Sequence, residues 1–249
     1  MVRRRPDLGW APLGKSARAD ERSVGSAAWH PAQVNAQEAL KTSLRGQLGP
    51  AARRHGFKGS APNWRKSSAA GDWAVVNVQS SSFSSADHLQ CVVNLAFAPE
   101  PWLRWKAEYL GAGMPRSVSE SLGLYRERLH PEGTPGGTDG WWDVTDAKSA
   151  RLAVEDMIAQ LEQHGWPVLE RMFSREEMLA RLQDGDLGMM QRSNFGVFFA
   201  RAEALLLMDV GPSDALYSRL DYALANAMPT QRDHAERFDR WVRAEAAKA

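Results

Sequence analysis

The stretch from Asp72 to Phe97, DWAVVNVQSSSFSSADHLQCVVNLAF, decides the fold of this 249-residue chain. It predicts two β-strands, about residues 73–80 and 89–97, joined by a polar, serine-rich loop. In the second strand apolar side chains recur at every second position, namely Leu89, Cys91, Val93, Leu95 and Phe97. A period of two places such a row on one face of a sheet. We therefore expect this row to face the core and to pair with a matching row on the first strand, Ala74, Val76 and Val78.

The opposite face of the predicted hairpin is polar. It carries Trp73, Val75, Asn77 and Gln79 on the first strand beside Gln90, Val92 and Asn94 on the second, so a row of carboxamides lies next to a tryptophan. Buried carboxamides are almost always hydrogen-bonded. Two interpretations follow: either the face is covered and its amides pair internally, or it is open and binds a peptide or a small polar ligand.

Helical patterns surround the hairpin. Before it, Leu40, Leu44 and Leu48 recur every four residues and predict a helix over about residues 34–55. After it, a helix is expected from Thr145 or Asp146 to about His164, with Gly165 ending it. From residue 194 onward the patterns are helical alone. The fold class predicted is therefore α+β, an antiparallel β-sheet with flanking helices followed by an all-helical C-terminal extension.

The same patterns predict three parts of the chain. Residues 1–33 show no sustained periodicity, and we expect them to form a disordered tail. Residues 34–185 form the α+β domain. Residues 194–249 form a helical extension packed on that domain, because three helices offer little core by themselves.

Composition and charge limit the kinds of partner and the cellular location that we expect for this chain. The formal net charge of +1 gives no electrostatic reason to expect nucleic acid as a partner. No run approaches the ~18 apolar residues that a membrane helix needs, so no membrane is expected either. The single cysteine, Cys91, cannot form an internal disulfide. That favours a reducing compartment and predicts a cytoplasmic location.

Motifs typical of metal, nucleotide and hydrolase sites are missing from the sequence. No two of the six histidines have the spacing of a metal site, and Gly-x-Ser-x-Gly, His-Glu-x-x-His and Gly-x-Gly-x-x-Gly do not occur. The glycine-rich segment 130–140 lacks the Gly-Lys-Ser/Thr ending of a P-loop and predicts a flexible surface loop. We therefore expect no cofactor and no metal, and we assign no catalytic residue.

Aromatic side chains are frequent, with ten tryptophans. Trp102, Trp105 and Tyr109 lie at i, i+3 and i+7 of a predicted helix, so they share one side. Such a stripe is typical of a core wall, and it can also stack on a base or a sugar.

Two classes of function remain. The first is a binding or interaction module that holds a protein partner or a small polar ligand on the polar sheet face and its tryptophan-rich edge. Its candidate residues are Trp73, Asn77, Gln79, Asn94, Trp141 and Trp142. The alternative is a hydrolytic enzyme with a site assembled from His130, Asp139 and Asp143.

Several motifs carry a resemblance to a known family. They are GFK at 56–58, Trp64, VVNVQSSS at 75–82, VVNLAF at 92–97 and WWDV at 141–144. Over about residues 38–178 the chain resembles one of the numbered bacterial families described as a "domain of unknown function". The resemblance implies an α+β fold and a bacterial source. It implies no established activity, so no catalytic residue is transferred.

Overall fold

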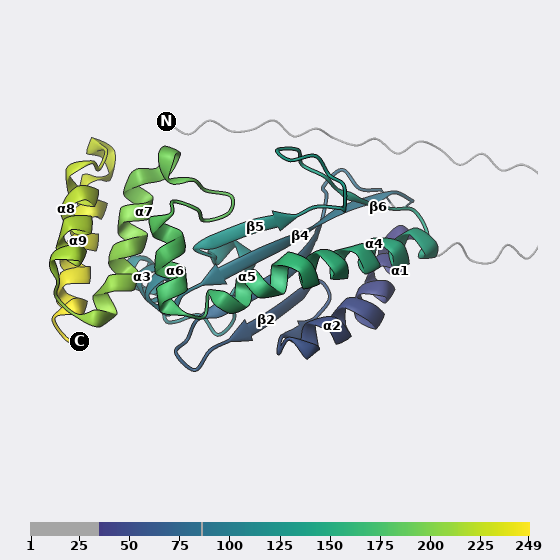
Figure 1. The fold of residues 1–249 in the computed structure, drawn as a ribbon, viewed down its shortest axis with the longest axis horizontal. Helices are drawn as coiled ribbons and strands as arrows, with labels where there is room; N and C mark the ends of the chain where they lie inside the picture. Colours follow the sequence, from purple (N-terminus) through teal and green to yellow (C-terminus); the bar gives the residue numbers. More distant parts are fainter. Residues whose placement is uncertain (1–34, 86) are drawn as a thin grey trace, which may run out of the picture. The chain divides into compact units, whose positions relative to one another are not determined.

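A computed structural model of the chain describes residues 35–85 and 87–249 (Figure 1). The predicted tail over 1–33 lies outside the described residues. The fold is α+β, as predicted: a six-stranded antiparallel sheet is followed by helices toward the C-terminus. The strands are β1 (Lys58–Ser60), β2 (Asn63–Ser67), β3 (Trp73–Ser80), β4 (Leu89–Ala98), β5 (Tyr125–Leu129) and β6 (Trp142–Val144). Their order is β1-β2-β3-β4-β5, with β6 pairing β4 beyond the end of β5.

The central hairpin has the predicted register. Ala74 lies opposite Phe97, Val76 opposite Leu95 and Val78 opposite Val93. The whole apolar row of β4 is buried within the hydrophobic core. The alternation of the sequence therefore identified the core face correctly.

The described part of the chain contains two long helical segments. In sequence, one precedes the six strands and the other follows them. The first joins α1 (Ala36–Ser43), a π-helical turn η1 (Leu44–Leu48) and α2 (Gly49–Arg54). The second joins α4 (Ala147–Gln160), a π-helical turn η3 (Leu161–Gly165) and α5 (Trp166–Arg171). The two segments pack against each other, mainly through α1 and α4.

Gly165 does not end its helix, contrary to the expectation from sequence. Its backbone is right-handed helical, and the chain continues directly into α5. Pro167 stands in the first turn of α5 and lacks a backbone N–H, so a regular helix would clash and lose a hydrogen bond there. The wider π-helical turn before it absorbs this mismatch. Pro50 follows η1 in the same way.

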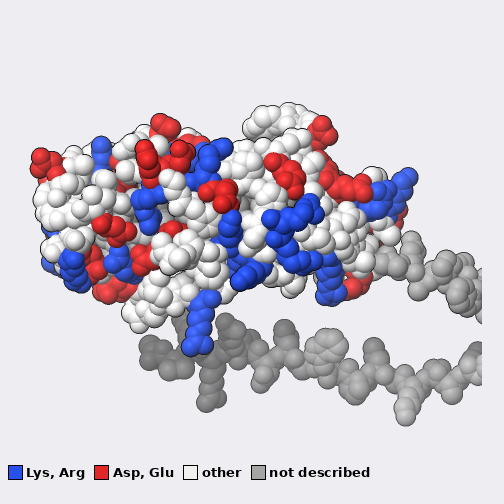
Figure 2. All heavy atoms as spheres, turned by 60° about the horizontal axis from the view of Figure 1, so that its bottom comes forward, with Lys and Arg blue, Asp and Glu red and all other residues white. Residues whose placement is uncertain are grey.

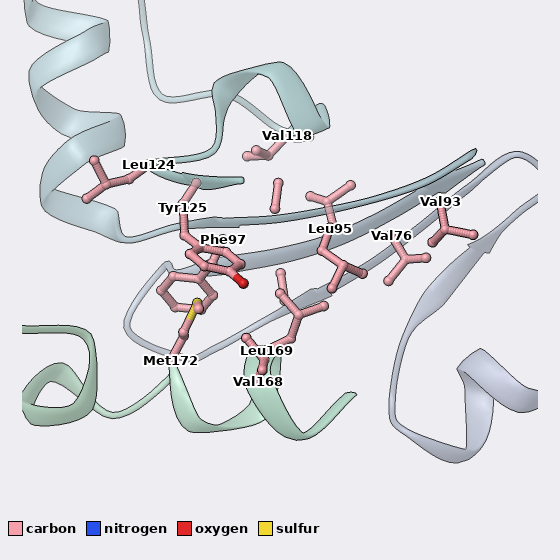
Figure 3. Packing of buried hydrophobic residues seen from close by; sticks show 14 of the residues in the cluster. Val76, Val93, Leu95, Phe97, Val118, Leu124, Tyr125, Val168, Leu169 and Met172 are labelled. Atoms are coloured by element: carbon pink, nitrogen blue, oxygen red, sulfur yellow. The ribbon is translucent and has the colours of Figure 1, made fainter. Parts of the chain in front are cut away.

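The core lies between this helical pair and the sheet. Val168, Leu169 and Met172 point from α5 and its end toward Leu95 and Phe97 of β4 (Figure 3). These side chains are buried almost completely. Burial of such side chains stabilises a fold by about 1.5–3 kcal/mol each.

The remaining helices gather at one end of the sheet (Figure 1). They are α3 (Glu100–Leu110), α6 (Arg175–Gln183), α7 (Arg192–Leu207), α8 (Asp214–Ala225) and α9 (Arg232–Ala246). Trp102 packs edge-on against Phe198, and Trp105 edge-on against Phe238. Both tryptophans are buried, whereas Tyr109 is 46% exposed.

The second face of the sheet is covered in part. The segment between α3 and β5, which includes the short 3-10 helix η2 (Glu120–Leu122), crosses it. Val118 of this segment is buried, and its carbonyl accepts a hydrogen bond from Arg65 Nε at 2.6 Å. Figure 3 shows Val118 on the side of the sheet away from α5. The part of this face near Asn77 and Gln79 stays accessible.

The described residues show no sign of a membrane-spanning helix, since none of their helices has the length and apolar character required. On the face drawn in Figure 2, lysine and arginine side chains are interspersed with aspartate and glutamate. This mixture agrees with the formal net charge of +1.

Candidate functional site

A row of polar side chains crosses four strands of the second sheet face. The register places Asn63 of β2 opposite Asn77 of β3, Asn77 opposite Asn94 of β4, and Asn94 opposite Arg128 of β5. Neighbouring strands lie about 4.8 Å apart, so the row is roughly 14 Å long. We call the row formed by Asn63, Asn77, Asn94 and Arg128 the amide row. Gln79 stands at its rim on β3, two residues after Asn77.

The amide row forms one directed chain of hydrogen bonds. Arg128 Nε donates to Asn94 Oδ1 in a long contact of 3.4 Å. Asn94 Nδ2 then donates to Asn77 Oδ1 at 3.2 Å and to Gln79 Oε1 at 2.8 Å. Asn77 Nδ2 donates in turn to Asn63 Oδ1 at 2.9 Å.

Arg128 fixes the direction of this chain. A guanidinium only donates hydrogen bonds, so it must face the oxygen of Asn94 rather than its amide nitrogen. The nitrogen of Asn94 then faces its two neighbours, which must present their oxygens to it. Each amide oxygen thus accepts one hydrogen bond within the row, whereas the amide nitrogens of Asn63 and Gln79 donate none there, so their N–H groups are available to a ligand.

Exposure varies along the row. Asn94 is 6% exposed, Asn77 and Trp73 are half-buried, and Gln79 is exposed. Among the described residues, no acceptor is bonded to the amide nitrogens of Asn63 and Gln79. The centre of this face is therefore paired internally, and its rim presents donors to solvent.

Arg128 also joins the amide row to the glycine-rich loop after β5. Its Nη1 lies 2.9 Å from both carboxylate oxygens of Asp139, and its guanidinium lies 5.5 Å from the ring centre of Trp141. The hydrogen bond from Arg128 holds the pKa of Asp139 below its ordinary value. Arg128, His130 and Asp139 line a cavity of about 340 Å³.

The two tryptophans of the WWD motif lie on opposite faces of the sheet. Trp141 is half-exposed and stacks with Arg128 beside the amide row. Trp142 lies opposite Cys91 on the core row, where it is buried, and its Nε1 donates to Asp156 at 2.7 Å. Consecutive strand residues point to opposite faces, so only Trp141 can edge the polar face.

Of the three residues of the hydrolase alternative, the structure brings His130 and Asp139 together at one cavity, while Asp143 has other partners. His130 Nδ1 lies 3.0 Å from the carbonyl of Gly140 and 3.9 Å from Asp139. Asp139 is held by Arg128, as described above. Asp143 instead bonds His88 Nε2 at 2.8 Å and Gln90 Nε2 at 3.1 Å.

Cys91 is no nucleophile in this environment. It is buried beneath β6, and burial together with the charge of Asp143 raises the pKa of its thiol to about 12. The thiolate, which is the reactive form, is therefore negligible at neutral pH. Within the described residues, no three histidine, cysteine, aspartate or glutamate side chains gather as a metal site.

Two members of the amide row, Asn63 and Arg128, were not among the residues singled out from sequence. An alternating sequence pattern can predict a strand, but it does not say which strands pair. Their place in the row depends on the register of β2 with β3 and of β4 with β5. Knowledge of that register would have identified both residues.

Comparison with known proteins gives one match. Residues 48–171 match the family model described as "Domain of unknown function (DUF4304)". This range contains the whole amide row and the loop that carries Asp139 and Trp141. No curated protein and no solved structure matches the chain.

Proposed function

Since residues 48–171 belong to the DUF4304 family, whose description names no activity, we propose a function from the geometry: the chain is a binding module that holds an extended, acidic segment of a partner protein on the amide row. The observation that carries this proposal is the direction of the hydrogen-bond chain. Each amide oxygen already accepts one hydrogen bond in the row, and the N–H groups of Asn63 and Gln79 that donate none within the row stand at its rim as donors. Donors of this kind suit backbone carbonyls and carboxylates.

The dimensions of the row suit a short peptide. A row of roughly 14 Å spans about four residues of extended chain. Trp141 stands at its border beside Arg128 and supplies apolar contact area, and a partly exposed aromatic residue of this kind is a typical anchor in a binding site. Trp73 lies four residues before Asn77 on β3, about 13 Å along the strand, and packs against the core instead.

Arg128 is the residue where an acidic side chain would engage. Its present carboxylate partner, Asp139, is 55% exposed and belongs to a loop, so a partner's carboxylate can compete for the same guanidinium. Arg–carboxylate pairs with two parallel hydrogen bonds are among the stronger polar contacts at an interface.

Selection from a phage-displayed library of random seven-residue peptides tests the proposal. We expect the wild-type protein to enrich peptides with aspartate or glutamate. In calorimetric titrations these peptides should bind Asn77→Ala/Gln79→Ala and Arg128→Gln at least about tenfold more weakly. The double alanine variant should still fold, with its free energy of unfolding lowered by about 1–3 kcal/mol, because it removes both acceptors of the buried Asn94 Nδ2.

Arg240→Gln is the matched control. Arg240 is an exposed arginine of α9, outside the amide row, and its replacement changes the net charge by the same amount as Arg128→Gln. Enriched peptides without acidic residues, or equal binding to the wild type and to the double alanine variant, would contradict the proposal.

A further inference from the structure

A cavity of about 410 Å³ lies between α3, α7 and α9, away from the amide row. Its walls are aromatic: Trp102, Trp105, Tyr109, Phe198 and Phe238 line it. Its volume is within the range of small-molecule sites, about 300–1,000 Å³. Tyr109, Thr230 and Gln231 are exposed, so the cavity is reached from solvent.

The polar lining of this cavity is basic. Lys106 of α3, Arg201 of α7 and His234 of α9 line it, and none of its ten lining residues is acidic. Among residues 35–85 and 87–249, neither Lys106 nor Arg201 has a carboxylate within ion-pair distance. Both side chains are half-buried, and cations withdrawn from water in this way are normally paired with an acid, so this arrangement is unusual.

Arg201 carries the clearest signal. Its Nε and Nη2 are buried, and they have no hydrogen-bond partner in the described part of the chain. The Nδ1 atom of His234 is in the same situation. A buried donor without a partner is costly and calls for an explanation, such as a ligand that satisfies it.

The surroundings weaken the charged forms of these groups. Burial lowers the pKa of Lys106 and that of Arg201. Burial also lowers the pKa of His234, and the charges of Arg201, Arg237 and Lys106 lower it further. The free site therefore holds uncompensated positive charge, which an anion would neutralise.

The aromatic walls are arranged around these cations. Lys106 Nζ lies 4.5 Å from the ring centre of Trp102, and the guanidinium of Arg201 lies 5.8 Å from that of Phe238. Cation–π contacts hold the two charges in place, yet they leave the donors of Arg201 unused. A ligand with a flat ring could pack on the aromatic walls while its acidic group reaches Arg201.

We propose that this cavity binds a small organic anion, a flat aromatic ring that carries a carboxylate or phosphate group. Arg201 and Lys106 hold the anionic group, and the ring packs against Trp105 and Tyr109. This site is distinct from the amide row and shares no residue with it.

Isothermal titration with matched naphthalene compounds tests the proposal. Naphthoate and naphthyl phosphate differ in their acidic group, naphthalenemethanol is neutral, and inorganic phosphate has no ring. We expect at least one of the two aromatic anions to bind roughly ten- to hundredfold more tightly than naphthalenemethanol and than inorganic phosphate. Comparison of naphthoate with naphthyl phosphate shows which acidic group the site prefers. Binding of both no tighter than that of the alcohol would overturn the proposal.

Arg201→Gln supplies a second, independent readout. It should weaken binding of the aromatic anion roughly ten- to hundredfold. Its melting temperature should be no more than about 2 °C below that of the wild type, because the substitution removes an unpaired buried charge. A larger decrease would show that Arg201 is a structural residue and would overturn the proposal.

Two further variants complete the test. Lys106→Gln should also weaken binding, since Lys106 lies on a different helix and contributes charge to the same cavity. Arg240 is exposed and does not line the cavity, so the Arg240→Gln variant should bind the aromatic anion as the wild type does. Unchanged binding in both Arg201→Gln and Lys106→Gln would refute the site.

Discussion

Asn94 holds the amide row in a single arrangement. Its side chain is almost fully buried and makes three of the hydrogen bonds in the chain, to Asn77, Gln79 and Arg128. The oxygen of Asn77 and the Nε of Arg128 depend on it. A central residue of this kind costs more to remove than one at the rim, because its partners stay partly buried.

We therefore predict that Asn94→Ala lowers the free energy of unfolding by about 1–3 kcal/mol. Gln79→Ala, at the exposed rim of the same row, should cost less than about 1 kcal/mol. Urea denaturation followed by circular dichroism measures both values. Equal costs for the two variants would mean that the row does not act as a connected chain.

At the scale of elements, β4 contributes side chains to both faces of the sheet. Its odd-numbered residues from Leu89 to Phe97 face the helical pair and form the core. On the other face it contributes Asn94 to the amide row. Leu95 is 1% exposed, and α5 packs directly over it (Figure 3).

We predict that Leu95→Asp prevents stable folding, because an unpaired charge on the core row costs more than about 4 kcal/mol. Gln79→Asp introduces the same charge on the exposed side of the neighbouring strand and should still fold. Thermal melts monitored at 222 nm distinguish the two. A cooperative melt of Leu95→Asp within a few degrees of the wild type would show that this row does not form the core.

At the scale of the whole described chain, Arg104 connects the C-terminal helices to the sheet. Its Nη1 pairs with Glu245 of α9 at 3.0 Å, and its Nη2 with Asp209, between α7 and α8, at 2.9 Å. Nearby, the buried carboxylate of Asp72 accepts a hydrogen bond from the backbone of Glu100 at 2.9 Å, which anchors the start of α3 to the central hairpin. Residues 34–249 accordingly form one compact unit.

We predict that sheet and C-terminal helices unfold together in a single transition. Arg104→Ala should lower the free energy of that transition by about 1–2 kcal/mol, since it removes three partly exposed ion pairs, to Glu100, Asp209 and Glu245. Circular dichroism and tryptophan fluorescence should report the same midpoint in the wild type and in the variant. Two separate midpoints would show that residues 194–249 unfold as an independent domain.

Much of the fold follows from the sequence. The sequence pattern alone predicted three features: the period-two row of β4, the Leu40–Leu44–Leu48 stripe and the polar opposite face. The motifs around Val75–Ser82 and Trp141–Val144 also resembled a family of unknown function, and the family match over residues 48–171 confirms that resemblance. Local patterns suffice here because side-chain periodicity depends on the backbone geometry of a single element.

Such local patterns did not predict that the helix of α4 continues through Gly165. A glycine followed by Trp166 and Pro167 is typical of a helix end. In the structure the segment stays helical while Trp166 packs against His55 and Phe57, which directly follow the other helical segment. Tertiary contacts outweigh a local propensity of about 1 kcal/mol.

The sequence by itself determined which face of the hairpin is apolar and which segments are helical, and its motifs indicated the resemblance to a family of unknown function that the match over residues 48–171 confirms. Only the tertiary structure decided that Arg128 completes the amide row, that Trp142 turns into the core, and that Arg201 meets Lys106 in one aromatic cavity. The physical reason is that each of these depends on contacts between elements far apart in the chain. Strand register and helix packing set such contacts, and a side chain's own neighbours in sequence carry no record of them.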